Sequence, residues 1–365
     1  MPLHTTRVGL LMVIVAAVIL LGGAYRQLAP GAKGAVLLTG GLGFIGSHVT
    51  EELLRRGYSV TIYDNESTGH NHNRRAREMV PMDIRRVNEL EKVGKCDYVI
   101  HLAAAISVAE SMKLPAKYTD NNIHGSQNVI DWAVARGVTR MVAASSAAVY
   151  GNPKGKDLPI KETQPYGGLS PYADSKYKME GLMRAAGAKG LDATALRFFN
   201  VYGPRQDPKS EYTGVISVFL DRGNNGQEVT INGDGSNTRD FVYVGDVARA
   251  IVTAMEFSGA FDVFNVCTGR ETTLEHLSLT IKALLGSSSK ISHGPARPGD
   301  IAKSVCDPSK AKEKLGFTAG FTVEQGLART AAWFRAEKAK AKGAPAPALK
   351  SGARRRLLRE AESSF

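Results

Sequence analysis

Short apolar runs alternate with helical patterns along the first half of the chain. Runs of this length are typical of strands that are covered on both faces in a parallel sheet. Between them, apolar residues recur with helical spacing, most clearly from Asp120 to Ala135. Because strands and helices alternate, we predict right-handed crossovers and one doubly wound parallel sheet of the α/β class. The predicted strands are Ala35–Leu38, Ser59–Tyr63, Cys96–Leu102 and Arg140–Ala144.

Spaced glycines follow the first predicted strand directly. Gly40, Gly43 and Gly46 precede or open a helix that is predicted to start near Phe44. In a strand–turn–helix of this kind the first glycine permits a tight turn, and the second lets the backbone approach a diphosphate. The third lets the helix pack against the strand. The segment therefore predicts a dinucleotide site in a Rossmann fold.

An acidic residue ends the second predicted strand. Asp64 lies roughly 20 residues beyond the glycines, where a carboxylate can accept both adenosine ribose hydroxyls and repel a 2′-phosphate. We therefore predict NAD rather than NADP as the cofactor. Arg74, Arg75 and Arg77 would soften this preference if their loop folded back.

Polar residues that can carry chemistry follow the later strands. Ser146 stands at a strand end, where doubly wound sheets bind their ligands. Ser170 and Pro171 resemble an N-cap and a first helical residue, which places Tyr172 and Lys176 one turn apart on one helix face. A Tyr-x-x-x-Lys pair alone is common by chance. Its position after a dinucleotide motif and a strand-end serine makes it a catalytic candidate.

The charge of the chain is uneven. Its 365 residues carry a formal charge of +12, and about half of that surplus lies after Trp333. A basic segment rich in Ala and Pro is typical of solvated disorder, so residues 336–365 are predicted to be a disordered tail. We expect no nucleic-acid partner. Cys96, Cys267 and Cys306 lack metal-site spacing and are expected to be buried or free thiols, without a metal.

The N-terminus contains an apolar segment. Val8 to Ala24 has no charged residue and is bracketed by Arg7 and Arg26, so residues 1–32 are predicted to be a membrane anchor and linker. The predicted location is a single-pass membrane protein, in the Golgi or endoplasmic reticulum of a eukaryote. A cleaved signal, with Gly22 and Ala24 before the cleavage point, and a soluble cytoplasmic form stay open.

Taken in order, these motifs resemble those of the extended short-chain dehydrogenase/reductases, and among them the UDP-hexose 4-epimerases. The resemblance runs from about Gly34 to Phe334. It rests on seven features, which are Thr39–Gly46, Asp64, His101–Ala104, Asn122, Ser145–Gly151, the pair Tyr172 and Lys176, and Arg197–Arg205.

The resemblance implies epimerisation at C4 of a UDP-hexose through a transient 4-keto sugar. Tyr172 would remove the proton of the 4-hydroxyl, and Ser146 would orient that hydroxyl. Lys176 would lower the pKa of the phenol, together with the oxidised nicotinamide, and bond the nicotinamide ribose. The implied NAD contacts are Gly40, Gly43, Phe44, Ile45, Gly46, Asp64, Asp83, Ile84, Leu102, Ala103, Ala104, Asn122, Ser145, Tyr172 and Lys176.

The resemblance also implies a division of the chain. Residues 33–198 would bind NAD, with a return at about 237–268, and 199–335 would form a smaller α/β domain for the UDP-sugar. A homodimer would form through the helix Asn122–Ala135 and the helix that begins at Ser170. The implied substrate contacts are Ser146, Asn200, Arg239, Arg297, Asp300 and Ser304.

Several alternatives share this fold. UDP-glucuronate decarboxylases and sugar dehydratases carry acidic residues where this chain has Ala147 and Ala148, so they are disfavoured. A UDP-glucuronate epimerase, a net NAD-dependent oxidoreductase and a non-catalytic NAD-binding protein stay open, the last being disfavoured by Ser146, Tyr172 and Lys176. Ser304 corresponds to a place where a tyrosine excludes N-acetyl groups, and it leaves UDP-glucose and UDP-N-acetylglucosamine both open.

Overall fold

A computed structural model describes residues 31–68, 78–208, 214–296 and 300–341. The predicted N-terminal anchor, Arg74, Arg75, Arg77, Arg297 and the tail beyond residue 341 lie outside these residues. Within them, no helix combines the length and apolar character that a membrane span requires.

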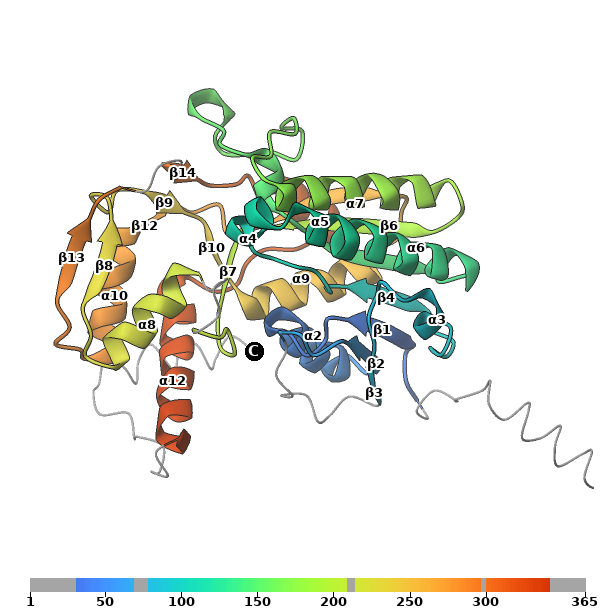
Figure 1. Cartoon of the computed structure of the whole chain (residues 1–365), viewed down its shortest axis with the longest axis horizontal. Coiled ribbons are helices and arrows are strands. Elements are labelled where there is room, and N and C mark those ends of the chain that lie inside the picture. Colours follow the sequence, from blue (N-terminus) through green and yellow to red (C-terminus); the bar gives the residue numbers. More distant parts are fainter. Residues whose placement is uncertain (1–30, 69–77, 209–213, 297–299, 342–365) are drawn as a thin grey trace, which may run out of the picture.

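Seven parallel strands form the central sheet (Figure 1). Their order is β11-β6-β5-β4-β1-β2-β3, so the chain reverses its direction of travel across the sheet between β1 and β4. Ligands of such sheets bind at the carboxyl ends of the strands beside this reversal. The strands are β1 (Ala35–Thr39), β2 (Ser59–Asp64), β3 (Glu78–Pro81), β4 (Tyr98–His101), β5 (Arg140–Ser146), β6 (Asp192–Phe198) and β11 (Asp262–Val266).

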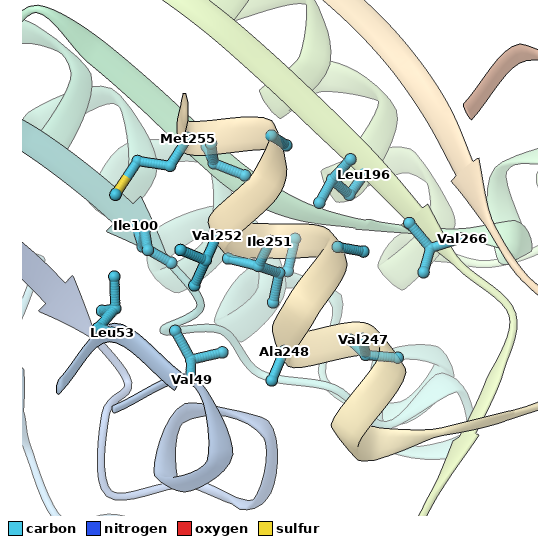
Figure 2. Packing of buried hydrophobic residues seen from close by; sticks show 14 of the residues in the cluster. Val49, Leu53, Ile100, Leu196, Val247, Ala248, Ile251, Val252, Met255 and Val266 are labelled. Atoms are coloured by element: carbon cyan, nitrogen blue, oxygen red, sulfur yellow. The ribbon is translucent and has the colours of Figure 1, made fainter. Parts of the chain in front are cut away.

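Helices cover both faces of this sheet. On one face α2 (Phe44–Arg55) packs beside α9 (Val244–Glu256), and Figure 2 shows Val49 and Leu53 of α2 facing Val252 of α9 over Ile100 of the sheet. The other face is covered by the helices α3 (Val87–Leu90), α6 (Gly125–Ala135) and α7 (Pro171–Gly187). The sheet is therefore buried on both sides, as its uninterrupted apolar strands require.

The remaining chain builds a second core beside the sheet (Figure 1). Buried residues such as Ile231, Leu277 and Leu327 form its centre. Its strands pair as β7 (Asn200–Tyr202) with β10 (Phe241–Tyr243), β8 (Val229–Asn232) with β13 (Ile291–Gly294), and β9 (Thr238–Arg239) with β12 (Thr272–Thr273) and β14 (Lys303–Ser304). Its helices are α8 (Val215–Asn224), α10 (Leu274–Leu285) and α12 (Val323–Ala341).

The remaining helical elements are short. They include the π turn η1 (Thr119–His124), which precedes α6, and the 3-10 turn η2 (Ala147–Tyr150), which follows β5. The others are α4 (Val108–Lys113), α5 (Pro115–Tyr118), η3 (Gly155–Asp157) and α11 (Ser309–Leu315).

The doubly wound α/β fold is confirmed, and the four predicted strands agree with the structure to within two residues at each end. The single helix predicted from Asp120 to Ala135 is instead a π turn followed by α6. The tail prediction was wrong for residues 336–341, which continue α12. Lys338 there donates from Nζ to the Asn224 carbonyl (2.5 Å) and to Asn225 Oδ1 (2.8 Å), so the helix is held against α8.

The cysteines need a second correction. Cys96 is a buried free thiol, but Cys267 and Cys306 form a disulfide with a Cα–Cα distance of 6.4 Å. Cys267 follows β11 directly, so the disulfide joins the end of this strand to the segment after β14, and Cys306 also pairs with Ile160 in an isolated β-bridge. Sequence spacing could not reveal this contact between residues that are distant along the chain.

Candidate active site

The glycine loop has the geometry of a phosphate cradle. Gly40 adopts φ +71°, and a Cβ there would lie 2.7 Å from the Ala103 nitrogen. A Cβ at Gly46 would collide with the Gly40 carbonyl, so the first turn of α2 packs directly on the loop. Gly43 caps α2 without a side chain, and a Cβ there would meet only the Gly40 carbonyl, at 3.3 Å. A side chain at Gly43 would thus crowd the loop less than one at Gly40 or Gly46, and the predicted close approach of a diphosphate remains a second reason for a glycine here.

Phe44 and Ile45 open α2 on this cradle. Both side chains are partly buried and pack against the second core, which fixes the N-terminus of the helix at the junction of the two parts. The N-terminus of α2 carries no acidic residue in its first turn, and no side chain caps it. Its backbone N–H groups and its dipole therefore favour an anion here.

Asp64 lies beside this loop. Its Oδ2 accepts a hydrogen bond from Leu42 N (3.0 Å) and its Oδ1 accepts one from Glu66 N (2.8 Å). Both bonds orient the carboxylate at the end of β2, next to the glycines. The predicted neighbours of the adenosine are thus brought together, although the role of Asp64 stays a prediction.

Asp83 and Ile84 stand at the next strand end. The Asp83 carboxylate accepts from the Arg85 guanidinium, with Nη2 to Oδ2 at 2.5 Å, and this pairing lowers the pKa of Asp83. Ile84 is buried, and its carbonyl accepts from Asn128 Nδ2 (3.0 Å). The carboxylate is therefore occupied by the protein, and Ile84 has a packing role as well.

The end of β4 closes the loop from the other side. Leu102 N donates to Thr39 O (3.1 Å), and Ala103 N donates to Thr39 Oγ1 (3.2 Å). Ala103 and Ala104 carry only methyl side chains, so backbone and ligand can pass close to one another. His101 is buried beneath them, and its ring nitrogens contact Thr39 Oγ1 (2.7 Å) and Ser126 Oγ (2.9 Å).

Ser146 and Tyr172 meet at the end of β5. Ser170 caps α7 through a hydrogen bond from Ala173 N (3.2 Å), and this places Tyr172 in the first turn as predicted. Burial raises the pKa of Tyr172 above its usual value, and a hydrogen bond with Ser146 opposes the rise. The groups of this chain therefore do not lower the pKa of the phenol below its ordinary value. The lowering predicted from a bound oxidised nicotinamide stays a prediction.

Lys176 is buried one turn further along α7. Its Nζ donates to the Ala144 carbonyl (2.8 Å) and lies 6.0 Å from the centre of the Tyr172 ring. Burial lowers the pKa of Lys176 to about 8, and the negative charge of Glu180 opposes that change. The ammonium is thus held near the Tyr172 ring, and its predicted effect on the pKa of the phenol stays a prediction.

Asn122 and Ser145 are engaged within the protein. Asn122 Oδ1 accepts from Ala105 N (2.8 Å), and its Nδ2 donates to Ala105 O (2.9 Å) and Ser175 Oγ (3.0 Å). Both amide donors are used, so Asn122 joins the segment after β4 to α7 instead of presenting a free amide to a cofactor. Ser145 Oγ donates to Glu180 Oε1 (2.5 Å) and likewise points into the protein.

Apart from Ser146, the predicted substrate residues that the structure describes lie on the second part. Ser304 is the parallel register partner of Arg239 in the β14–β9 pair. Arg239 Nη1 donates to the carbonyls of Thr238 (2.8 Å) and Ile301 (2.5 Å), and Nη2 lies 3.3 Å from Asp300 Oδ1. Three of the predicted residues therefore share one small surface.

Asn200 and its neighbour Asp240 form the link to that surface. Asn200 donates from N (3.0 Å) and Nδ2 (3.2 Å) to the Asp240 carbonyl. The Asp240 carboxylate accepts from Thr268 N and Gly269 N, each at 2.8 Å, while Asp246 accepts from backbone N–H groups of a neighbouring loop. Both aspartates therefore hold neighbouring loops in place.

Glu180 and Arg197 are the site residues that sequence reasoning did not assign a role. Arg197 donates to Glu180 from Nε (2.9 Å) and Nη2 (2.6 Å), and both side chains are more than nine-tenths buried. A glutamate four residues after Lys176 on the same helix face was the available signal.

Known proteins provide a comparison for this arrangement. The model of the NAD dependent epimerase/dehydratase family matches residues 36–267. The UDP-glucose 4-epimerase of Mycolicibacterium smegmatis is 35% identical over 309 residues, which is 82% of this chain and 98% of that protein.

Solved structures give the same result. The UDP-glucose 4-epimerase of Thermotoga maritima, solved with UDP-glucose, is similar with a TM-score of 0.80 and 39% identity, covering 83% of this chain and 99% of that one. The UDP-N-acetylglucosamine 4-epimerase of Methanobrevibacter ruminantium M1, solved with UDP-N-acetylmuramic acid, has a TM-score of 0.79 and 35% identity. It covers 84% of this chain and 99% of that one.

Proposed function

Because this chain belongs to the NAD dependent epimerase/dehydratase family, we propose that it interconverts the C4 epimers of a UDP-hexose with NAD as its cofactor. The enzyme is a nucleotide-sugar epimerase. The observation that carries the proposal is the meeting of Ser146, Tyr172 and Lys176 at the strand ends that also form the glycine cradle.

The cradle residues fit NAD. Gly43 leaves space for a diphosphate, and the Asp64 carboxylate is held beside it by Leu42 N. When bound, NAD supplies reversible hydride exchange at the sugar carbon. Asp64 would accept the adenosine ribose hydroxyls, and Lys176 would donate to the nicotinamide ribose.

The protein residues then move one proton. Tyr172 would take the proton of the sugar 4-hydroxyl through its phenolic oxygen and return it after the sugar has turned over. Ser146, which hydrogen-bonds the phenol, would orient that hydroxyl. The Lys176 ammonium would stabilise the phenolate.

Simple epimerisation fits better than elimination or decarboxylation. Ala147 and Ala148 open the turn η2 directly after Ser146 and carry no titratable group. A departing hydroxyl needs a proton donor at this place, and neither Ala147 nor Ala148 offers one. The Tyr150 hydroxyl of η2 donates to Asn265 Oδ1 (2.6 Å) instead. We therefore place epimerisation before the decarboxylase alternative.

The direct test uses the purified full-length chain, NAD and a panel of UDP-sugars, with products separated by chromatography. We expect C4 epimers to form without a stoichiometric change in NADH. Net NADH production would support an oxidoreductase instead, and loss of carbon dioxide from UDP-glucuronate would support a decarboxylase. Absence of any product with bound NAD would support a non-catalytic binding protein.

The sugar that is accepted depends on Ser304. We propose that its small side chain, beside Arg239, leaves room for a 2-N-acetyl group, so that UDP-N-acetylglucosamine is a substrate together with UDP-glucose. Ser304→Tyr should suppress turnover of the N-acetyl sugar and spare UDP-glucose. Ser304→Ala is the matched control, because it keeps the space. Equal loss for both sugars would remove Ser304 from specificity.

Our proposed division of labour assigns 33–198 and about 237–268 to NAD, and most of 199–335 to the UDP-sugar. Asn200, Arg239, Arg297 and Asp300 would contact the nucleotide, although Arg297 lies outside the described residues. Arg239→Met should raise KM for the UDP-sugar and leave the Kd of NAD unchanged.

We propose a homodimer through the helix Asn122–Ala135 and the helix that begins at Ser170. Leu169, just before that second helix, and Tyr177, within it, expose apolar side chains that such a contact would cover. Light scattering on the purified protein tests this, and a monomer would contradict it.

Membrane attachment through residues 1–32 is a separate proposal, supported by the uncharged run from Val8 to Ala24. The full chain should resist carbonate extraction from membranes, whereas a chain that starts at Gly34 should not associate with them. A mature N-terminus at Tyr25 would show a cleaved signal instead.

A further inference from the structure

We propose that Glu180 is a positioning residue, whose buried carboxylate keeps the Lys176 ammonium charged beside Tyr172 during turnover. This inference rests on the proposed roles of Tyr172 and Lys176. It assigns a function to the buried pair Glu180–Arg197, which none of the sequence motifs explains.

The geometry puts three groups in one row. Tyr172, Lys176 and Glu180 recur every four residues along α7 and therefore share a helix face. Glu180 is 3% exposed and is bonded on both oxygens, by Ser145 Oγ, Arg197 Nε and Arg197 Nη2. The carboxylate cannot rotate away from Lys176 without losing these bonds.

Stability alone does not account for this pair. Two charges removed from water lose hydration, and a well-packed apolar pair of the same size is often as stable or more stable. Ser145, which bonds Glu180, directly precedes Ser146, and Lys176 bonds the Ala144 carbonyl. The pair thus connects the strand end that carries the serine with the helix that carries the base.

The charged and titratable groups around Lys176 determine how much Glu180 contributes to keeping its ammonium charged. From β4 comes His101, which burial keeps neutral by lowering its pKa to about 3, and β6 contributes the cationic Arg197. On η1, Asn122 is neutral, while Asp120 and His124 are exposed. Helices α4 and α6 bring Glu110, paired with Lys117, and the exposed Asp131.

Among the described residues that face Lys176, Glu180 is therefore the one buried side chain that carries a negative charge. No described carboxylate forms an ion pair with the Lys176 ammonium, whose Nζ bonds a neutral carbonyl. Burial favours the neutral amine, and the field of Glu180 one helical turn away is what opposes this.

The test compares variants of the two partners. In Glu180→Gln the alkaline limb of the kcat–pH profile should move about one unit to lower pH, since Lys176 loses its proton earlier. In Arg197→Met, which keeps the carboxylate, the limb should stay or move to higher pH. Both single variants should lose thermal stability, because each leaves one buried charge unpaired.

A double variant avoids the loss of stability that is expected for the single variants. Glu180→Gln combined with Arg197→Met leaves no buried charge unpaired, and its limb should still move to lower pH. The single variant Glu180→Asp keeps the negative charge, so its alkaline limb should lie closer to that of the unmodified protein than the limb of Glu180→Gln does. A purely structural pair would lower the stability of the single variants Glu180→Gln and Arg197→Met and leave the alkaline limb unmoved in all four variants, and that result would overturn the proposal.

A second readout does not need turnover. The near-ultraviolet absorbance of tyrosinate, taken as the difference between each NAD-saturated protein and its Tyr172→Phe counterpart, reports the ionisation of Tyr172 directly. Glu180→Gln should raise the midpoint of this titration, and an unchanged midpoint would contradict the proposal. If no UDP-hexose is epimerised, the proposed function fails, whereas an active enzyme with an unmoved limb contradicts only the role of Glu180.

Discussion

Two arginine–carboxylate pairs lie on different parts of the molecule and differ in burial. Arg197 and Glu180 have side chains that are 8% and 3% exposed, whereas those of Arg239 and Asp300 are 16% and 34% exposed. In the first pair two short bonds join the guanidinium to the carboxylate. The second has a single contact of 3.3 Å, while carbonyls hold the other nitrogen.

This difference indicates two uses of the same chemistry. The buried pair is a fixed part of the scaffold that joins α7 to β6, because neither partner can exchange with water. For Arg239, the proposed exchange of the long Asp300 contact for a phosphate oxygen would cost little, since a partly exposed ion pair with a single 3.3 Å contact contributes little stability. We therefore expect changes on the buried side to alter folding and reaction rate, and changes on the exposed side to alter ligand selection.

The largest effect should come from the reacting group beside the buried pair. Tyr172→Phe should lower kcat about 10²–10⁴-fold, because general acid–base groups contribute on this scale, while the Kd of NAD and the melting temperature stay nearly unchanged. Steady-state kinetics and calorimetry check both parts. Tyr177→Phe, which changes an exposed tyrosine on the same helix, is the control. Near-normal epimerisation by Tyr172→Phe would reject the assigned base.

Breaking the two ion pairs should lower the free energy of unfolding by different amounts. Arg197→Met should reduce the free energy of unfolding by about 3–5 kcal/mol, because Glu180 is left as an unpaired buried charge. Asp300→Asn should reduce it by about 1 kcal/mol or less. Urea unfolding of both variants measures the two values. Equal losses would show that the difference in burial has no energetic meaning.

Low pH should reduce the stability of the fold through the buried His101. Burial lowers the pKa of His101 to about 3, so the unfolded chain binds its proton more readily. The contribution of neutral His101 to the free energy of unfolding is complete above pH 6.5. It is lost as the pH falls from 6.5 toward 3, and the loss amounts to about 2 kcal/mol at pH 5. His101→Gln should flatten this part of the stability curve, whereas His124→Gln, at an exposed site, should leave its slope unchanged.

The smallest effect should concern the choice of cofactor. Asp64→Asn should weaken NAD binding about tenfold and reduce discrimination against NADP, because it removes an anionic acceptor at a half-buried site. Titration calorimetry with both nucleotides measures this. Glu66→Gln, at a neighbouring exposed carboxylate, is the control. Unchanged selectivity in Asp64→Asn would place recognition of the ribose elsewhere.

The sequence predicted the parts of the fold that depend on local pattern. Apolar runs are sufficient for buried strands, and Gly40 and Gly46 could be interpreted because only glycine fits a turn with φ +71° or a collision with backbone. Ser170 and Pro171 fixed the start of α7, and with it the spacing of Tyr172 and Lys176.

Contacts between distant segments could not be predicted in this way. Strands as short as Thr238–Arg239 and Lys303–Ser304 have no usable periodicity, so the pairing of Arg239 with Ser304 depends on tertiary structure. The same holds for Glu180, whose partner Arg197 comes from another element, and for the disulfide Cys267–Cys306. Asn122 was recognised by its motif, but its bonds to Ala105 and Ser175 required the structure.

The π-helical segment η1 makes the predicted site sensitive to the length of the chain between α5 and α6. A π turn holds an additional residue relative to an α-helix, and such turns often mark functional sites. Deleting one residue from Thr119–His124 would allow a more regular helix, but it would rotate the preceding residues by about 100° relative to α6. Asn122 could then no longer reach both Ala105 and Ser175. A shortened chain would thus gain a more regular helix at η1 but lose the hydrogen bonds of Asn122 that join the segment after β4 to α7.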